Sequence, residues 1–193
     1  MLNNSKEIKD IYEEIQRKIF YAVPGKWDEL YLYASIIDRL GNVQTGEMYF
    51  YFLPKGLLKR KFINLYEIPA KYDIEEDEYM KFVEDLYDEV KLLREECIKN
   101  GKKVWSNLTI SIKNSRFKIE YNYDNLIGGK DAYYDHHIFW RQKYLHIEPQ
   151  GKKEKHAIEN YLARENKSIK KDELVRKIRI EGVKLDVKKE REE

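Results

Sequence analysis

The chain has 193 residues, of which 42% are apolar and 37% are charged, and its net charge is +2. This composition predicts a domain with a core of its own and disfavours a general nucleic-acid-binding protein. The single cysteine, Cys97, excludes a disulfide within the chain and a cysteine-based zinc site. Because no segment resembles a signal peptide or a membrane span, we expect a cytoplasmic protein.

A helix and three strands are predicted first along the chain. The helix covers residues 5–22, where isoleucines recur at spacings of three and four. Strands rich in aromatic and β-branched residues are expected at 29–38, 47–54 and 61–68. Glycines between the first two strands predict an antiparallel pair, and Pro69 is expected to end the third strand.

A long amphipathic helix is predicted over residues 74–100, followed by a hairpin. Asn114 and Ser115 form the expected turn between strands at 105–113 and 116–124. In the first of these strands apolar residues alternate with polar ones. We therefore expect one buried face and one solvent-exposed face there.

Two further helices are predicted at 134–147 and 152–165, and a charged tail follows them. A hairpin, a helix and disorder all remain open for the tail. Together the elements predict an α+β fold. An antiparallel sheet of about five strands would have helices packed on it, in the order α-βββ-α-ββ-α-α. The expected division is a domain at 1–165 and a tail at 166–193.

The long helix is strongly acidic. Residues 73–96 contain eleven acidic and three basic residues, a net charge of −8. One interpretation is a solvated helix face, and the other is an interface for a strongly basic partner such as a nuclease. With Leu86 at the centre of the buried face, seven acids and one leucine become the candidate binding residues. They are Asp77, Glu78, Glu84, Asp85, Asp88, Glu89, Leu92 and Glu96.

A second candidate site is the triplet Asp135-His136-His137, whose letters name a class of metal-dependent phosphoesterases. That chemistry needs several carboxylates and imidazoles around two metal ions. No buried strand precedes this triplet, and no Asp-x-Asp lies upstream. Adjacent residues on a helix also diverge by about 100°. The sequence therefore favours ordinary helix histidines, and a metal-dependent phosphoesterase remains an alternative.

The remaining motifs give no indication of catalysis. The chain contains no phosphate-binding glycine loop, no dinucleotide-binding motif and no nucleophile elbow. Cys97 lies on the apolar face of the long helix, which is typical of a core residue. We therefore expect no enzyme activity, no metal and no cofactor. Binding of nucleic acid or another anion by the basic tail is a further alternative.

Several short segments, taken in order over residues 8–165, resemble the YezG-like immunity proteins. The segments are Pro24-x-x-Trp27, "MYFYFLPKG", Ile68-Pro69, "FVEDLYDEVKLLREE", Trp105, Phe117-x-x-x-Tyr121-x-Tyr123, "WRQKYLHIEP" and "IENYL". Members of that family are cytosolic antitoxins against polymorphic toxins. Those toxins include nucleases exported by type VII secretion systems of Gram-positive bacteria.

This resemblance implies an α+β protein without catalytic activity that binds and neutralises a cognate toxin by occlusion. The expected partner is a basic nuclease domain that meets the acidic helix, without direct contact to nucleic acid or membrane. A homodimer is left open. Five aromatic residues are expected to be structural: Trp27, Trp105, Tyr121, Tyr123 and Trp140.

Overall fold

The computed structural model describes residues 5–39, 44–56, 60–114, 116–123, 126 and 130–167. The chain forms two compact units, Met1–Ile127 and Gly128–Glu193. The expected boundary between residues 165 and 166 stays a prediction, because residues 168–193 lie outside the described part.

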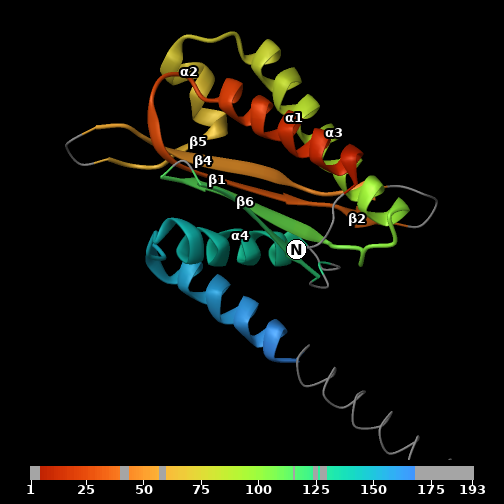
Figure 1. The fold of residues 1–193 in the computed structure, drawn as a ribbon. Helices are drawn as coiled ribbons and strands as arrows, with labels where there is room; N and C mark the ends of the chain where they lie inside the picture. The colour runs from red at the N-terminus through yellow and green to blue at the C-terminus, as the bar shows by residue number, and fades with distance from the viewer. Residues whose placement is uncertain are drawn as a thin grey trace, which may run out of the picture. The chain divides into compact units, whose positions relative to one another are not determined.

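A five-stranded antiparallel sheet forms the base of the first unit (Figure 1). Its strand order is β5-β4-β1-β6-β7, and the predicted pairing of the first two long strands is confirmed. Two further short strands, β2 and β3, pair with each other. The strands are β1 Trp27–Ser35, β2 Ile37–Asp38, β3 Gln44–Thr45, β4 Met48–Pro54, β5 Ile63–Asn64, β6 Asn107–Lys113 and β7 Arg116–Asn122.

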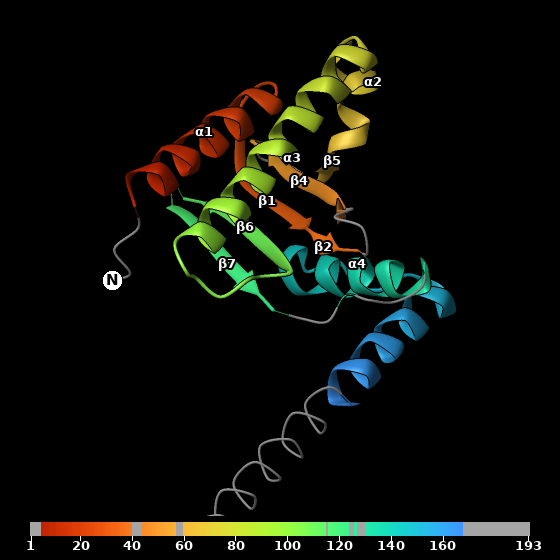
Figure 2. The ribbon, with the colours of Figure 1, turned by 90° about the vertical axis from the view of Figure 1, so that its right-hand side faces the viewer.

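Two helices lie side by side over one face of this sheet, α1 (Lys6–Ala22) and α3 (Glu76–Lys99) (Figures 1 and 2). Ser5 caps α1, because its side chain accepts a hydrogen bond from the Ile8 amide at 3.3 Å. The Tyr79 hydroxyl of α3 donates to the carbonyl oxygen of Ala22 at 3.1 Å. The end of α1 therefore meets the start of α3, so that the two helices run antiparallel.

The apolar stripes of both helices and one face of the sheet form the core of the first unit. Each fully buried aliphatic or aromatic side chain there contributes about 1.5–3 kcal/mol. The core residues exposed by 1% or less include Ile8, Ile15, Ile19, Leu30, Leu32, Phe50, Phe52, Leu86, Val90, Leu93, Leu108 and Ile110.

The third predicted strand, 61–68, is wrong beyond Asn64. The chain turns instead into the 3-10 helix η2 (Leu65–Glu67) and the short helix α2 (Ile68–Tyr72). Asn64 causes this change, since its side chain accepts from the Tyr66 amide while its own amide donates to the Glu67 carboxylate. The proline that was expected to end a strand lies in the first turn of α2, where its missing N–H costs nothing.

The prediction that one face of β6 is exposed to solvent is also wrong for most of the strand. Thr109 and Asn107 are each 1% exposed, so both faces of β6 are buried over its first half, and only Lys113 at its end is exposed. β6 is an inner strand between β1 and β7, and its polar groups are hydrogen bonded there: the Asn122 side chain donates to the Asn107 side chain at 3.0 Å.

The second unit contains α4 (Lys130–Leu145) and a helix over residues 151–167, which confirms both predicted helices. The two helices contact each other directly. The rings of Phe139 and Tyr161 stack at 4.1 Å, and an Arg164 guanidinium nitrogen lies 2.8 Å from the Asp135 carboxylate. With this pair, the predicted α+β class, the five-stranded antiparallel sheet and the order α-βββ-α-ββ-α-α are confirmed.

Candidate protein-binding surface

The outer face of α3 carries most of the candidate binding residues. Because Leu86 and its neighbours at helical spacing face the sheet, residues half a turn away point into solvent. Leu92 is 41% exposed, although it is apolar. The exposed acids of the predicted set are Asp77, Glu78, Glu84, Asp85 and Asp88.

One flank of this face is shared with α1. The Lys18 ammonium lies 3.2 Å from the Glu89 carboxylate and also donates to the Asp85 carbonyl oxygen at 3.2 Å. The side chains of Lys18 and Glu89 are only 15% and 21% exposed. The predicted binding residue Glu89 therefore takes part in the contact between α1 and α3.

The other predicted acids differ in how far they are neutralised. Asp88 lies 2.7 Å from the Lys91 ammonium, and Glu96 pairs with Lys99 at 3.3 Å. In contrast, the carboxylates of Glu84 and Asp85 form no ion pair with any residue that the structure describes. Asp77 and Glu78 are likewise exposed and without an ion pair among the described residues, so these four acids leave uncompensated charge toward solvent.

Arg94, one of the three basic residues within residues 73–96, does not lie on this surface. It is 4% exposed and donates two hydrogen bonds to the Asp38 carboxylate, at 2.6 and 3.1 Å. A third bond, at 2.9 Å, goes to the carbonyl oxygen of Trp105. The Arg94 guanidinium holds the pKa of Asp38 below its ordinary value.

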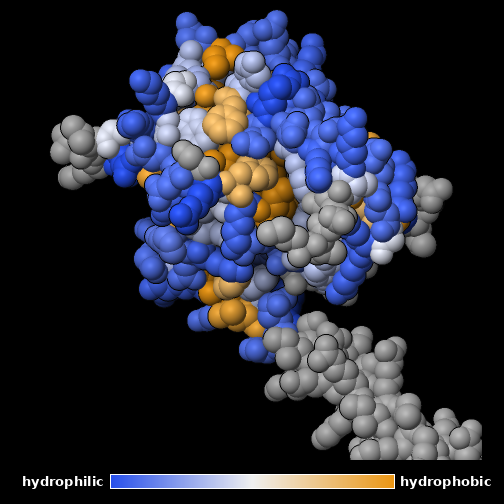
Figure 3. Space-filling model, in the orientation of Figure 1, coloured by the Kyte–Doolittle hydropathy of each residue, from blue (hydrophilic) through white to orange (hydrophobic). Residues whose placement is uncertain are grey.

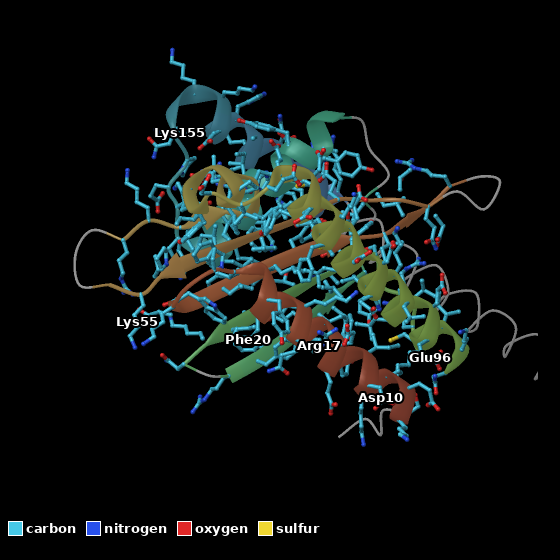
Figure 4. The ribbon with its side chains drawn as sticks, turned by 90° about the horizontal axis from the view of Figure 1, so that it is seen from above. Asp10, Arg17, Phe20, Lys55, Glu96 and Lys155 are labelled. Atoms are coloured by element: carbon cyan, nitrogen blue, oxygen red, sulfur yellow. The ribbon has the colours of Figure 1, made fainter. Side chains whose placement is uncertain are left out.

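The exposed face of α1 continues the surface beside α3. Asp10 and Arg17 project from α1, and Glu96 lies on α3 (Figure 4). Tyr21 is 72% exposed, and its ring centroid lies 5.6 Å from the Arg17 guanidinium carbon. Sequence reasoning missed Tyr21, although its place outside the isoleucine stripe indicated exposure. We call these outer faces of α1 and α3 the two-helix surface: Asp10, Glu14, Arg17, Lys18, Tyr21, Asp77, Glu78, Glu84, Asp85, Asp88, Glu89, Leu92 and Glu96.

Exposed apolar side chains are dispersed over the rest of the molecule. Figure 3 shows a face that is mainly hydrophilic, with small apolar groups between the charged residues. Besides the aromatic and aliphatic residues of the two-helix surface, exposed examples include Tyr66, Ile98, Val104 and Leu162. Single exposed apolar residues of this kind are common and do not by themselves indicate a site.

The five aromatic residues that were expected to be structural lie in different surroundings. Trp105 and Trp140 are each 2% exposed, and the ring centroids of Trp105 and Tyr121 are 5.6 Å apart. Trp27 contacts Phe20 at the end of α1. Tyr123 is 46% exposed and lies under the Lys103 ammonium at 4.0 Å.

The triplet Asp135-His136-His137 lies on α4 within the helix pair. Asp135 bonds to Arg164, and the His136 ring packs edge-on against Tyr161 at 5.6 Å. Burial lowers the pKa of both histidines to about 4. No group of three or more metal-binding side chains occurs among the described residues. The geometry therefore gives the phosphoesterase alternative no support.

Two other expectations from the sequence concern the charged tail and membrane-spanning helices. The tail that was considered as an anion-binding segment lies outside the described part of the chain, apart from its first residues. Within residues 5–167, as far as they are described, no helix combines the length and apolarity that crossing a bilayer requires.

A small α+β protein whose main surface feature is a charged pair of helices fits the class of proteins that act by binding another protein. A family model described as "Immunity protein YezG-like" matches residues 8–159. The chain therefore belongs to the YezG-like immunity protein family, as its sequence segments indicate.

Two curated relatives agree with this assignment. Immunity protein YezG of Bacillus spizizenii is 31% identical over 160 residues, which cover 82% of this chain and 95% of that protein. Immunity protein YezG of Bacillus subtilis is 28% identical over 156 residues, which cover 80% of this chain and 99% of that protein. The similarity thus extends over nearly the whole of both relatives.

Proposed function

We propose that this chain is a cytoplasmic immunity protein that binds a cognate toxin and neutralises it by occlusion, without catalysis of its own. The family membership supports the immunity function. We further propose that the toxin is a nuclease with a basic active-site face, and that it meets the two-helix surface. The observation that carries this second step is the set of uncompensated acids on the outer side of α3.

The charge argument starts from the nature of nuclease surfaces. A nuclease binds phosphates through lysine and arginine side chains. A protein that covers such a face can place carboxylates where the phosphates would lie. Glu84 and Asp85 have this character, since both are exposed and form no ion pair within the described chain.

Charge alone would not hold the complex together. Exposed ion pairs are typically worth about 0–1 kcal/mol each, whereas complementary fields mainly accelerate association. Tight binding needs side chains that lose their water on contact. Leu92, 41% exposed among the acids of α3, and Tyr21, 72% exposed on α1, are the candidate anchors.

The contact between Lys18 and Glu89 has a different part in this proposal. It joins the two helices at 3.2 Å within the free protein. A surface whose helices are already fixed loses less entropy on binding than a mobile one. Glu89 therefore acts as a positioning residue, and the direct toxin contacts fall to its exposed neighbours.

The test requires the toxin domain encoded beside this chain in the source genome, expressed with and without the chain. The expected result is that growth of the producing cells and integrity of plasmid and RNA depend on the immunity chain. Association rates are then measured over a range of salt concentrations. The variant Glu84→Lys/Asp85→Lys should associate at least tenfold more slowly, with a flatter salt dependence.

A matched control carries the same change in charge on the second unit, Glu148→Lys/Glu159→Lys, at exposed positions. It should associate nearly as fast as the natural chain. If both double variants slow association equally, net charge acts without a localised surface. An unchanged rate in Glu84→Lys/Asp85→Lys would place the toxin on another face.

A further inference from the structure

β7 forms one edge of the five-stranded sheet, at the opposite end from β5 (Figure 2). We propose that two copies of the chain pair antiparallel through β7, about a twofold axis at Ile119, so that their sheets join into one of ten strands. This proposal does not rest on toxin binding.

The first argument concerns the backbone groups of β7 that point away from the sheet. Lys113 pairs with Arg116 across a two-residue turn, in which Asn114 has a φ of 50°. The pair that closes such a turn is hydrogen bonded, and bonded pairs then alternate along the hairpin. The N–H and C=O groups of Phe117, Ile119 and Tyr121 therefore point outward. Among the described strands, β6 is the one neighbour of β7.

These outward groups fit a second copy of the same strand. With the axis at Ile119, that residue lies opposite Ile119 of the second copy, and Phe117 lies opposite Tyr121. All three are residues whose backbone groups are directed outward, so each facing pair can exchange two hydrogen bonds. A register shifted by one residue would lose this match.

The second argument concerns charge. In the same register Lys118 lies opposite Glu120 of the second copy, and Glu120 lies opposite Lys118. These are pairs of the non-bonded kind, in which the side chains approach most closely. Charges on an edge strand usually prevent pairing, but here their order makes the strand complementary to itself. Within one chain the two side chains already lie on the same face, 2.9 Å apart.

The third argument concerns the opposite face of β7. Phe117, Ile119 and Tyr121 are half-buried there. Ile119 pairs with Ile110, which is fully buried, so this face continues the apolar face of the sheet. Pairing of two β7 strands would cover the exposed parts of these side chains. Edge, charge and apolar face thus all favour the same register.

Sedimentation velocity over a wide range of concentration tests the proposal. The natural chain should approach twice the 23.4 kDa mass of one chain. Lys118→Glu and Glu120→Lys should each raise the dissociation constant about tenfold, because like charges then face each other twice. A mixture of the two variants should dimerise again, since each Glu then faces a Lys. The doubly exchanged variant should also dimerise.

The mixture is also the control for folding, because misfolded variants could not form the mixed dimer. Far-UV circular dichroism of each variant checks this independently. A natural chain that stays at the mass of one copy at all concentrations would overturn the proposal. So would single variants that dimerise as well as the natural chain, since the contact would then lie elsewhere.

Discussion

Lys18 of α1 lies 3.2 Å from Glu89 of α3, and the same ammonium group donates to the Asp85 carbonyl oxygen. The two side chains are 71 positions apart in sequence and are both largely buried at their contact. This ion pair neutralises an acid of α3 from a neighbouring helix. It also fixes the two helices that make up the two-helix surface.

Removal of either partner should loosen the contact between α1 and α3. Because both side chains are mostly shielded from water, we expect a coupling energy of about 1 kcal/mol between Lys18→Ala and Glu89→Ala. Urea unfolding of the two single variants and the double variant measures it. The exposed pair Arg17 and Glu14 is the matched control, and its cycle should give a smaller coupling. Equal couplings in both cycles would contradict this account.

Substitution of Arg94 should lower the free energy of unfolding by more than substitution of Lys18 or Glu89. Arg94 bonds to Asp38 and to the carbonyl oxygen of Trp105 while 4% exposed. Arg94→Met should lower the free energy of unfolding by about 2–4 kcal/mol, because it leaves a buried carbonyl without its donor. Lys91→Met, on the outside of the same helix, should change it by less than about 0.5 kcal/mol. Urea unfolding compares the two variants.

The same ion pair predicts a pH dependence. Arg94 lowers the pKa of Asp38 in the folded state. The ion pair therefore stabilises the fold fully at pH values above the ordinary Asp pKa of 3.8. This stabilisation is lost as the pH falls through the lower pKa that Asp38 has in the folded state. The difference in unfolding free energy between the natural chain and Asp38→Asn should shrink below about pH 4. A difference independent of pH would show that the charge of Asp38 is not involved.

The rotation of α3 could be predicted from its sequence, because one apolar stripe fixes which side faces the sheet. The contact of Lys18 with Glu89 could not, since periodicity within one helix does not tell which helix lies beside it. In the sequence Arg94 counted only as one of the three bases of residues 73–96, although it follows Val90 of the buried face by one turn. Its burial became possible only with Asp38, a partner from a distant strand.

The wrong prediction of a strand over residues 65–68 has a local cause that can be seen in the sequence. Asn64 and Glu67 have the spacing of a capping box, but the apolar residues around them favoured a strand. The paired hydrogen bonds of Asn64 and Glu67 determine the outcome. A capping signal four residues long, Asn64 to Glu67, thus overrides a longer apolar pattern.

Gly46 provides a test of packing beside α3. A Cβ atom there would lie 1.9 Å from the backbone oxygen of Ser35 and 2.2 Å from the Tyr87 hydroxyl, which donates to that oxygen. Gly46→Ala should therefore lower the free energy of unfolding by about 3 kcal/mol. Gly56→Ala, whose nearest neighbours are 3.9 Å away on the flexible Arg60 side chain, is the matched control. Similar unfolding midpoints for both variants would show that the Ser35 backbone yields easily.

The buried His136 and the half-buried His137 of α4 predict that the helix pair of the second unit weakens in mild acid. Burial lowers the pKa of His136 and His137 from 6.5 to about 4, with their mutual repulsion and nearby cations adding to the shift for His136. The folded state thus binds these protons more weakly than the unfolded state. Stability is complete above about pH 6.5 and is lost as the pH falls toward 4, by up to roughly 3 kcal/mol for each histidine.

Hydrogen exchange of peptides from residues 130–167, compared between variants at the same pH, measures this local stability. The double variant His136→Gln/His137→Gln should lose less protection between pH 6.5 and 4.5 than the natural chain, because glutamine gains no charge over that range. Lys155→Gln, an exposed change on the adjacent helix, should alter protection equally at each pH. If the natural chain and the double variant lose protection in parallel, other groups cause the acid sensitivity.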